Sequence, residues 1–138
     1  MSTTPHSDPQ TQPEPPSMAV WNMGLRFLLE VAGAAALVWW GWIVVDSWPH
    51  YLLAPGAPLF VMTLWGVFNV PGDRSRSGKA PVRVPGVVRL LLEFGIFGSA
   101  VAALSVAWNA TAAAAFAGVL LLHYAASRRR VVWLLRTR

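Results

Sequence analysis

The sequence has no cysteine and very little charge. Without cysteine it has no disulfide framework, no thiolate nucleophile and no cysteine-based metal site. Charged residues make up 12% of the 138 residues, about half the share usual for a soluble domain. Hydrophobic residues make up 55%, and the mean hydropathy is +0.47. A chain this short has too little polar surface to cover so much apolar material in water, so its expected solvent is lipid.

Catalytic and cofactor motifs are also missing. The sequence contains no glycine-rich phosphate loop, no Ser/His/Asp set with an identifiable nucleophile and no metal-ligand spacing. Its length suggests one domain, which leaves no room for a separate soluble catalytic domain. We therefore expect a protein that is not an enzyme and has no cofactor. A membrane enzyme acting on lipids is the weakest alternative.

The basic residues lie between and after the apolar runs. In a soluble protein a net charge of +5 and a pI near 11.1 would suggest nucleic acid. Because the basic residues flank apolar runs, we instead expect them to set membrane topology or to contact anionic lipid. We expect the bilayer as the main partner, with anionic lipid headgroups at a basic loop and a basic tail, and no nucleic acid.

The order of apolar and polar segments predicts an all-α polytopic membrane protein. Residues 1–20 are rich in proline and are expected to be a disordered tail. Residues 21–127 are predicted to form a transmembrane domain of four helices. The predicted spans are 21–45, 52–70, 86–107 and 111–127.

Two of these spans are short, which leaves three spans as the alternative to four. Pro55 and Pro58 predict that regular helix in the second span begins only near Pro58. Residues 128–138 form a basic C-terminal tail, predicted to be a helix in the headgroup region with its arginines snorkelling to the surface.

The distribution of Lys and Arg predicts the orientation. The loop 71–85 carries four of them and the tail 128–138 carries five, whereas the loops after the first and third spans carry none. The positive-inside rule therefore places the loop, the tail and, with four spans, both termini in the cytosol.

A charged pair occurs twice inside the apolar sequence. Arg26-Phe27-Leu28-Leu29-Glu30 opens the first apolar run, and Arg89-Leu90-Leu91-Leu92-Glu93 opens the third, 63 positions later. This spacing predicts two tandem helical hairpins of the same orientation, with all four charges at similar depth near the cytosolic side. His123 is expected to reach the same intramembrane charged layer.

Two interpretations of this charged layer stay open. In the first, Glu30, Glu93 and His123 line a polar cavity that binds a cation or relays a proton, as in a small transporter or channel component. A transporter of this size is expected to be a homodimer or larger. In the second, the protein is an accessory or structural membrane protein, and the Arg/Glu pairs only hold helices together, within one helix or across two.

Several short motifs carry a resemblance to a known family. Leu25 to Glu30, then Trp40-Gly41-Trp42, Ala57-Pro58-Leu59, Leu64 to Phe68 and Arg89 to Phe94 occur in that order. In these motifs the chain resembles the YrdB family of small bacterial membrane proteins, over roughly Met23 to Leu104. The resemblance implies a multi-pass protein of the bacterial cytoplasmic membrane and supplies no activity, because the family is a domain of unknown function.

Overall fold

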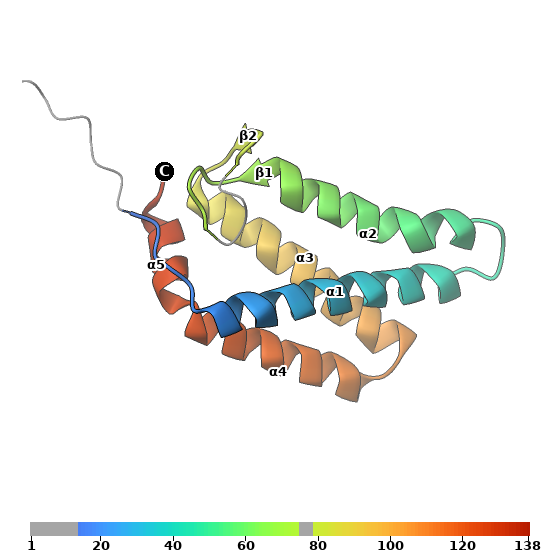
Figure 1. Ribbon diagram of the computed structural model, residues 1–138. Coiled ribbons are helices and arrows are strands. Elements are labelled where there is room, and N and C mark those ends of the chain that lie inside the picture. Colours follow the sequence, from blue (N-terminus) through green and yellow to red (C-terminus); the bar gives the residue numbers. More distant parts are fainter. Residues whose placement is uncertain (1–13, 75–78) are drawn as a thin grey trace, which may run out of the picture.

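The computed structural model describes residues 14–74 and 79–138, which form a bundle of helices (Figure 1). The helices are α1 (Val20–Ile43), α2 (His50–Val67), α3 (Gly86–Ala107), α4 (Ala110–Ala126) and α5 (Arg128–Arg136). Two short strands, β1 (Phe68–Asn69) and β2 (Val82–Arg83), pair in parallel between α2 and α3. The predicted all-helical fold is confirmed, with this strand pair as an addition. The tail predicted at 1–20 lies mostly outside the described residues, and residues 14–19 form neither helix nor strand.

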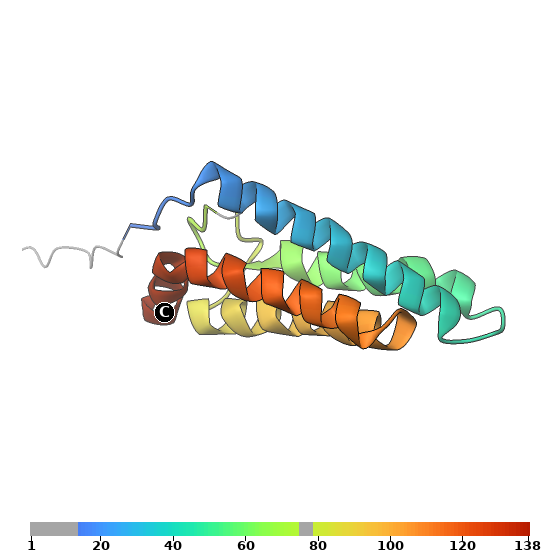
Figure 2. The ribbon, with the colours of Figure 1, turned by 90° about the horizontal axis from the view of Figure 1, so that it is seen from below.

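Helices α1 to α4 run alongside one another, and the two ends of the bundle differ. The α1–α2 and α3–α4 connections lie at one end, and the strand pair and α5 lie at the other (Figures 1 and 2). Helix α1 packs against both α2 and α3, and α4 packs against α3. The chain therefore forms two helical hairpins joined through α1 and α3. Their origin as a tandem repeat stays a prediction.

Helix α2 begins earlier than the sequence predicts. It starts at His50 and continues through Pro55 and Pro58 to Val67, so the predicted start near Pro58 is wrong. A proline inside a helix removes one backbone hydrogen bond, and packing against α1 supports this part of α2. A Cβ added at Gly41 of α1 would lie 2.6 Å from the Leu53 backbone, so only glycine allows this close approach.

The core is small, and much of each helix faces outward. The largest buried cluster joins four helices through Leu29, Trp65, Phe97, Ala100 and Phe116. Helices α1, α2 and α3 are each long and apolar enough to cross a membrane, yet only 17–33% of their most apolar windows is buried. An apolar surface of this extent is typical of a protein that faces lipid or a partner.

A fourth span depends on how α4 and α5 are counted. Helix α4 has 17 residues, and α5 follows it after a bend of 70° at Ser127. The two helices are apolar enough for a membrane only when taken as one bent span. Residues 14–74 and 79–138 thus contain three helices that could span a membrane, or four with this pair.

Candidate functional site

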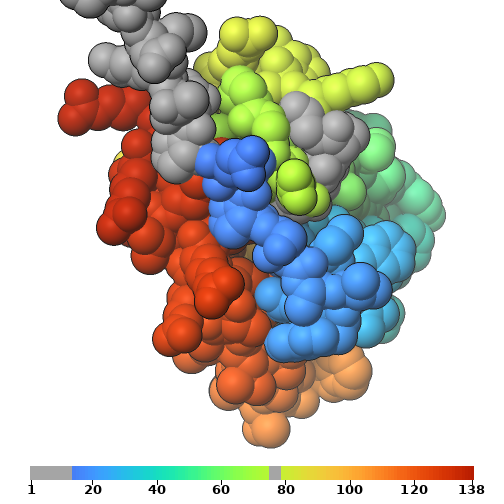
Figure 3. Space-filling model, turned by 60° about the vertical axis from the view of Figure 1, so that its left-hand side comes forward, coloured from blue at the N-terminus to red at the C-terminus, as the bar shows by residue number. Residues whose placement is uncertain are grey.

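A cluster of buried charges lies at the end of the bundle that carries the strand pair and α5. Its members are Arg26 and Glu30 of α1, Asp73 of the segment after β1, Arg89 and Glu93 of α3, and Arg130 of α5. We call these six residues the charge cluster. Figure 3 views the molecule toward this end, where the start of α1, the strand segment and α5 form the surface. Four separate segments of the chain therefore meet at one polar site.

Glu93 is the centre of the charge cluster. Its Oε1 accepts hydrogen bonds from Arg26 Nη2 at 2.8 Å, Arg89 Nε at 3.2 Å and Arg130 Nη2 at 2.7 Å. Its Oε2 accepts from Arg130 Nη1 at 3.1 Å and from the Tyr124 hydroxyl at 3.3 Å. The side chain has no exposed surface. A carboxylate offers about four lone-pair directions, so five donors saturate it.

Arg130 connects this centre to Asp73. Its Nε donates to Asp73 Oδ1 at 3.1 Å and its Nη2 to Asp73 Oδ2 at 2.6 Å, a bidentate pair buried on both sides. A tight turn sets the position of Asp73: its amide donates to the Val70 carbonyl at 3.1 Å, and Gly72 takes a φ of +81°. A type II turn needs a positive φ at its third residue, and glycine adopts this conformation without strain. Arg130 thus holds the loop and α5 together beside Glu93 of α3.

The guanidinium groups of Arg26 and Arg89 both lie near the ring of Trp65, the buried tryptophan of α2. Their Cζ atoms are 5.2 and 5.6 Å from the Trp65 ring centroid, within the range of cation–π attraction. Arg89 Nη1 also donates to the carbonyls of Trp65 and Phe68, which tie it to the end of α2. Since a helix end leaves carbonyls without intrahelical partners, a buried arginine is well placed to satisfy them.

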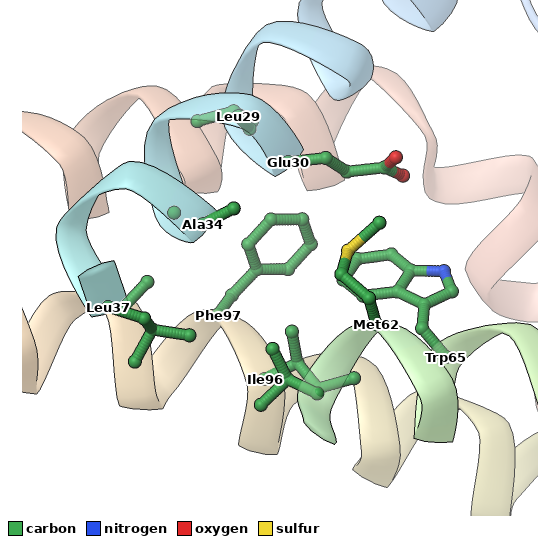
Figure 4. Close-up of a pocket in the computed structure, with 11 residues that line it drawn as sticks. Leu29, Glu30, Ala34, Leu37, Met62, Trp65, Ile96 and Phe97 are labelled. Carbon is green, nitrogen blue, oxygen red and sulfur yellow. The ribbon is translucent and has the colours of Figure 1, made fainter. Parts of the chain in front are cut away.

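Glu30 lies at the edge of the charge cluster. Its Oε1 accepts from Arg26 Nε at 3.2 Å, and its side chain keeps 15% exposure. Figure 4 shows Glu30 extending toward Trp65 at one end of a pocket whose other end holds Leu37 and Ala34. This pocket has a volume of about 10 Å³, and its remaining lining is apolar. It has room for at most about one water molecule.

A second polar group joins α4 to the start of α1. His123 Nδ1 lies 2.8 Å from Asn22 Oδ1, and Asn22 Nδ2 donates to the Ser127 hydroxyl at 2.7 Å. All three side chains are buried. Because a carbonyl oxygen faces Nδ1 of His123, this nitrogen is the donor in a neutral ring. His123 is therefore held by an amide and not by a carboxylate.

The structure brings together most of the residues that the sequence singled out. Both i, i+4 pairs form, Arg26 with Glu30 and Arg89 with Glu93, and the pairing also crosses between α1 and α3 through Arg26 and Glu93. His123 lies one helical turn from the bend into α5, but its hydrogen-bond partner is Asn22. Glu30 lines the pocket of Figure 4, whereas Glu93 and His123 do not.

Arg130 corrects the prediction for the C-terminal tail. The tail does form a helix, but Arg130 is 2% exposed and points inward, so it does not snorkel to the surface. The buried positions Ser127, Arg130, Leu134 and Thr137 follow a helical period along one face of α5. Arg130 falls on this helical period, whereas Arg128 and Arg129 do not and are exposed.

Asp73 is the second cluster member that the sequence did not single out. It is the single acid in a segment, 71–85, that otherwise carries Lys and Arg, and this isolation is its one signal. With it, three arginines and three carboxylates make up the charge cluster, so their formal charges cancel. Within 14–74 and 79–138, no group of three or more His, Cys, Asp or Glu side chains could hold a metal ion.

Comparison with known proteins places the chain in a family. A family model described as "Protein of unknown function (DUF2568)" matches residues 24–121. The chain belongs to this family. It is also similar to the "Uncharacterized protein YrdB" of Bacillus subtilis (strain 168), with 41% identity over 114 residues, which are 83% of this chain and 93% of that protein. No solved structure matches the chain.

The DUF2568 match includes only part of the polar site. Arg26, Glu30, Asp73, Arg89 and Glu93 lie within residues 24–121. Arg130 of α5 and both residues of the Asn22–His123 contact lie outside it. The family resemblance expected from the sequence is confirmed, and the family's description assigns no activity.

Proposed function

We propose that this DUF2568 protein is a multi-pass protein of the bacterial cytoplasmic membrane with an accessory or structural role and no catalytic activity. The observation that carries the proposal is the saturation of Glu93 by three arginines and a tyrosine hydroxyl. A charge cluster of this kind joins α1, α3, α5 and the Asp73 loop into one unit. Apolar helix faces around it suit a lipid environment.

The geometry argues against transport through the carboxylates. A cation would have to displace buried guanidinium groups, those of Arg26, Arg89 and Arg130, from Glu93. The pocket beside Glu30 is too small for a hydrated ion. In the part of the chain that the structure describes, neither Glu93 nor the pocket beside Glu30 thus offers a place for a hydrated cation.

Ion flux measurements test this point directly. In liposomes that contain the purified protein, we expect proton and cation flux to equal that of protein-free liposomes, because the carboxylates are closed into ion pairs. A flux above this background that disappears in Glu93→Gln would overturn the accessory role. As a control for reconstitution, an added ionophore must collapse the gradient equally in both preparations.

The orientation follows from the two unlike ends of the bundle. Among the described residues, every exposed Lys or Arg lies at the end with the strand pair and α5, and the acid Asp46 lies at the other end. The positive-inside rule assigns the basic end to the cytosol. This arrangement agrees with cytosolic N- and C-termini for a chain of four spans.

The absence of cysteine makes the orientation easy to test. Single cysteines at Ser47 and at Lys79 would occupy exposed positions at the two opposite ends. In intact cells stripped of their wall, a membrane-impermeant maleimide is expected to label Ser47→Cys and to leave Lys79→Cys unlabelled. Both should react after permeabilisation. The reverse pattern, or equal labelling before permeabilisation, would contradict the proposed topology.

A further inference from the structure

A pocket opens at the basic end where three segments meet. It is lined by Pro71, Arg83, Val84, Pro85, Thr137 and Arg138, and its volume is about 280 Å³. Its walls are fixed by main-chain bonds: the Gly86 amide donates to the Thr137 carbonyl at 2.9 Å, and the Val84 amide donates to the Asn69 carbonyl at 3.1 Å. The pocket is therefore a product of the fold and not of one loose loop.

Charge makes this pocket suitable for an anion. Its lining contains two arginine side chains and no Asp or Glu side chain. The arginines come from separate segments, Arg83 from β2 and Arg138 from beyond α5. Unlike Arg26, Arg89 and Arg130, these two are exposed, and no carboxylate ion pair with either is seen in the described chain. Arginine is the residue that best matches the geometry of a phosphate group.

A separate apolar groove lies along α3 and begins at Val88, three residues after Pro85 of the pocket. It lies between α2 and α3, has a volume of about 450 Å³ and is lined by apolar and small residues from Val88 to Ser99 on the α3 side. Pro85 of the pocket and Val88, Leu92, Gly95 and Ser99 of the groove follow one another at helical spacing on one face. From Val88 to Ser99 the helix rises roughly 16 Å, close to half the thickness of the hydrocarbon core.

We propose that the pocket and the groove together bind one anionic phospholipid. The headgroup phosphate lies between Arg83 and Arg138, and one acyl chain lies in the groove between α2 and α3. A soluble anion would use the pocket alone, whereas the nearby groove gives the apolar part of a lipid a place at the depth of one leaflet. The inference rests on the proposed membrane location and orientation.

Native mass spectrometry of the full chain tests the proposal. The protein, purified with an N-terminal tag so that Arg138 keeps its place, is delipidated and mixed with phosphatidylglycerol or phosphatidylcholine of identical acyl chains. We expect one phosphatidylglycerol to be retained in preference to phosphatidylcholine. Arg83→Gln/Arg138→Gln is expected to lower this retention roughly tenfold or more, since each basic residue contributes to binding an anionic headgroup.

Two further variants separate the site from general electrostatics. Arg74→Gln/Arg129→Gln removes the same charge from exposed positions of the same end and is expected to bind nearly as the wild type does. Gly95→Leu fills the groove at a position where a new Cβ meets no atom within 4 Å, so it should lower lipid retention without disturbing the helix. Equal losses in both double variants, or retention unaffected by Gly95→Leu, would refute the site.

A competition experiment distinguishes a lipid phosphate from free inorganic phosphate as the ligand of the pocket. Inorganic phosphate in large excess is expected to leave the lipid bound, because it cannot occupy the groove. Displacement by inorganic phosphate would show that the pocket takes a free anion instead. A protein that retains neither lipid but shows the expected maleimide pattern would overturn this inference alone and leave the proposed membrane topology intact.

Discussion

Replacing Glu93 with Gln is expected to lower the free energy of unfolding by about 3–5 kcal/mol, the usual cost of breaking a buried ion pair from one side. Three guanidinium groups, those of Arg26, Arg89 and Arg130, donate to this carboxylate in a site without exposure. A neutral amide keeps the shape but removes the charge that offsets their desolvation. Thermal unfolding in lipid or mild detergent, followed by tryptophan fluorescence, measures the loss.

Glu30→Gln is the matched control, because the substitution is the same and the residue belongs to the same cluster. Its side chain keeps 15% exposure, and Arg26 still has Glu93 as a carboxylate partner when Glu30 becomes neutral. We expect a loss of about 1 kcal/mol or less, as for partly exposed pairs. If the Glu93→Gln protein has the same free energy of unfolding as the wild type, the charge cluster does not have the structural role that we propose.

A second variant shows whether the loss comes from charge or from shape. In Glu93→Gln/Arg130→Gln one cation is removed together with the anion, which leaves less uncompensated charge in the buried site. We expect part of the stability lost in Glu93→Gln to return, a non-additive result typical of residues in direct contact. If the two losses simply add, Arg130 does not depend on Glu93.

Local patterns in the sequence predict the helices and the first charges correctly. The apolar run 21–45 corresponds to α1, and the run 86–107 corresponds to α3 residue for residue. The repeated Arg-x-Leu-Leu-Glu spacing places each pair on one helix face, and the packing of α1 against α3 brings Arg26 within reach of Glu93. These features depend on the spacing of apolar and charged residues along the chain, which can be seen in a single sequence.

Contacts between distant segments could not be predicted in the same way. Arg130 lies 37 positions from Glu93 and 57 from Asp73, and an Arg-Arg-Arg run after an apolar helix is typical of a membrane interface. Only the 70° bend at Ser127 turns one of these three arginines inward. Likewise, the start of α2 at His50 depends on packing against Gly41, which outweighs the local effect of Pro55 and Pro58.

The bend at Ser127 also decides which function the charges support. Without α5 and the Asp73 loop, Glu93 would keep its bonds to Arg26 and Arg89 but would have an open side, as a binding site requires. Arg130 closes that side with two hydrogen bonds to Glu93 and two to Asp73. The accessory role therefore depends on the docking of α5, and the contact that holds α5 in place is open to a direct test.

Gly86→Ala is expected to detach α5 and to destabilise the protein by about 3 kcal/mol or more. A Cβ at Gly86 would overlap the Leu134 carbonyl, a main-chain group in α5 that cannot rotate away like a side chain. Moving α5 also breaks the Gly86–Thr137 hydrogen bond and withdraws Arg130 from Glu93. The melting temperature, and the rate of trypsin cleavage after the buried Arg130, measure the two effects.

Gly98→Ala supplies the control in the same helix. A Cβ at Gly98 meets no atom within 4 Å, so this substitution should leave α5 docked and, through the higher helix propensity of alanine, cost nothing. Cleavage after Arg130 should therefore rise in Gly86→Ala and stay at the wild-type rate in Gly98→Ala. Wild-type melting and cleavage of Gly86→Ala would contradict this prediction. They would mean that α5 does not pack against the start of α3 and that Arg130 does not complete the hydrogen bonding of Glu93.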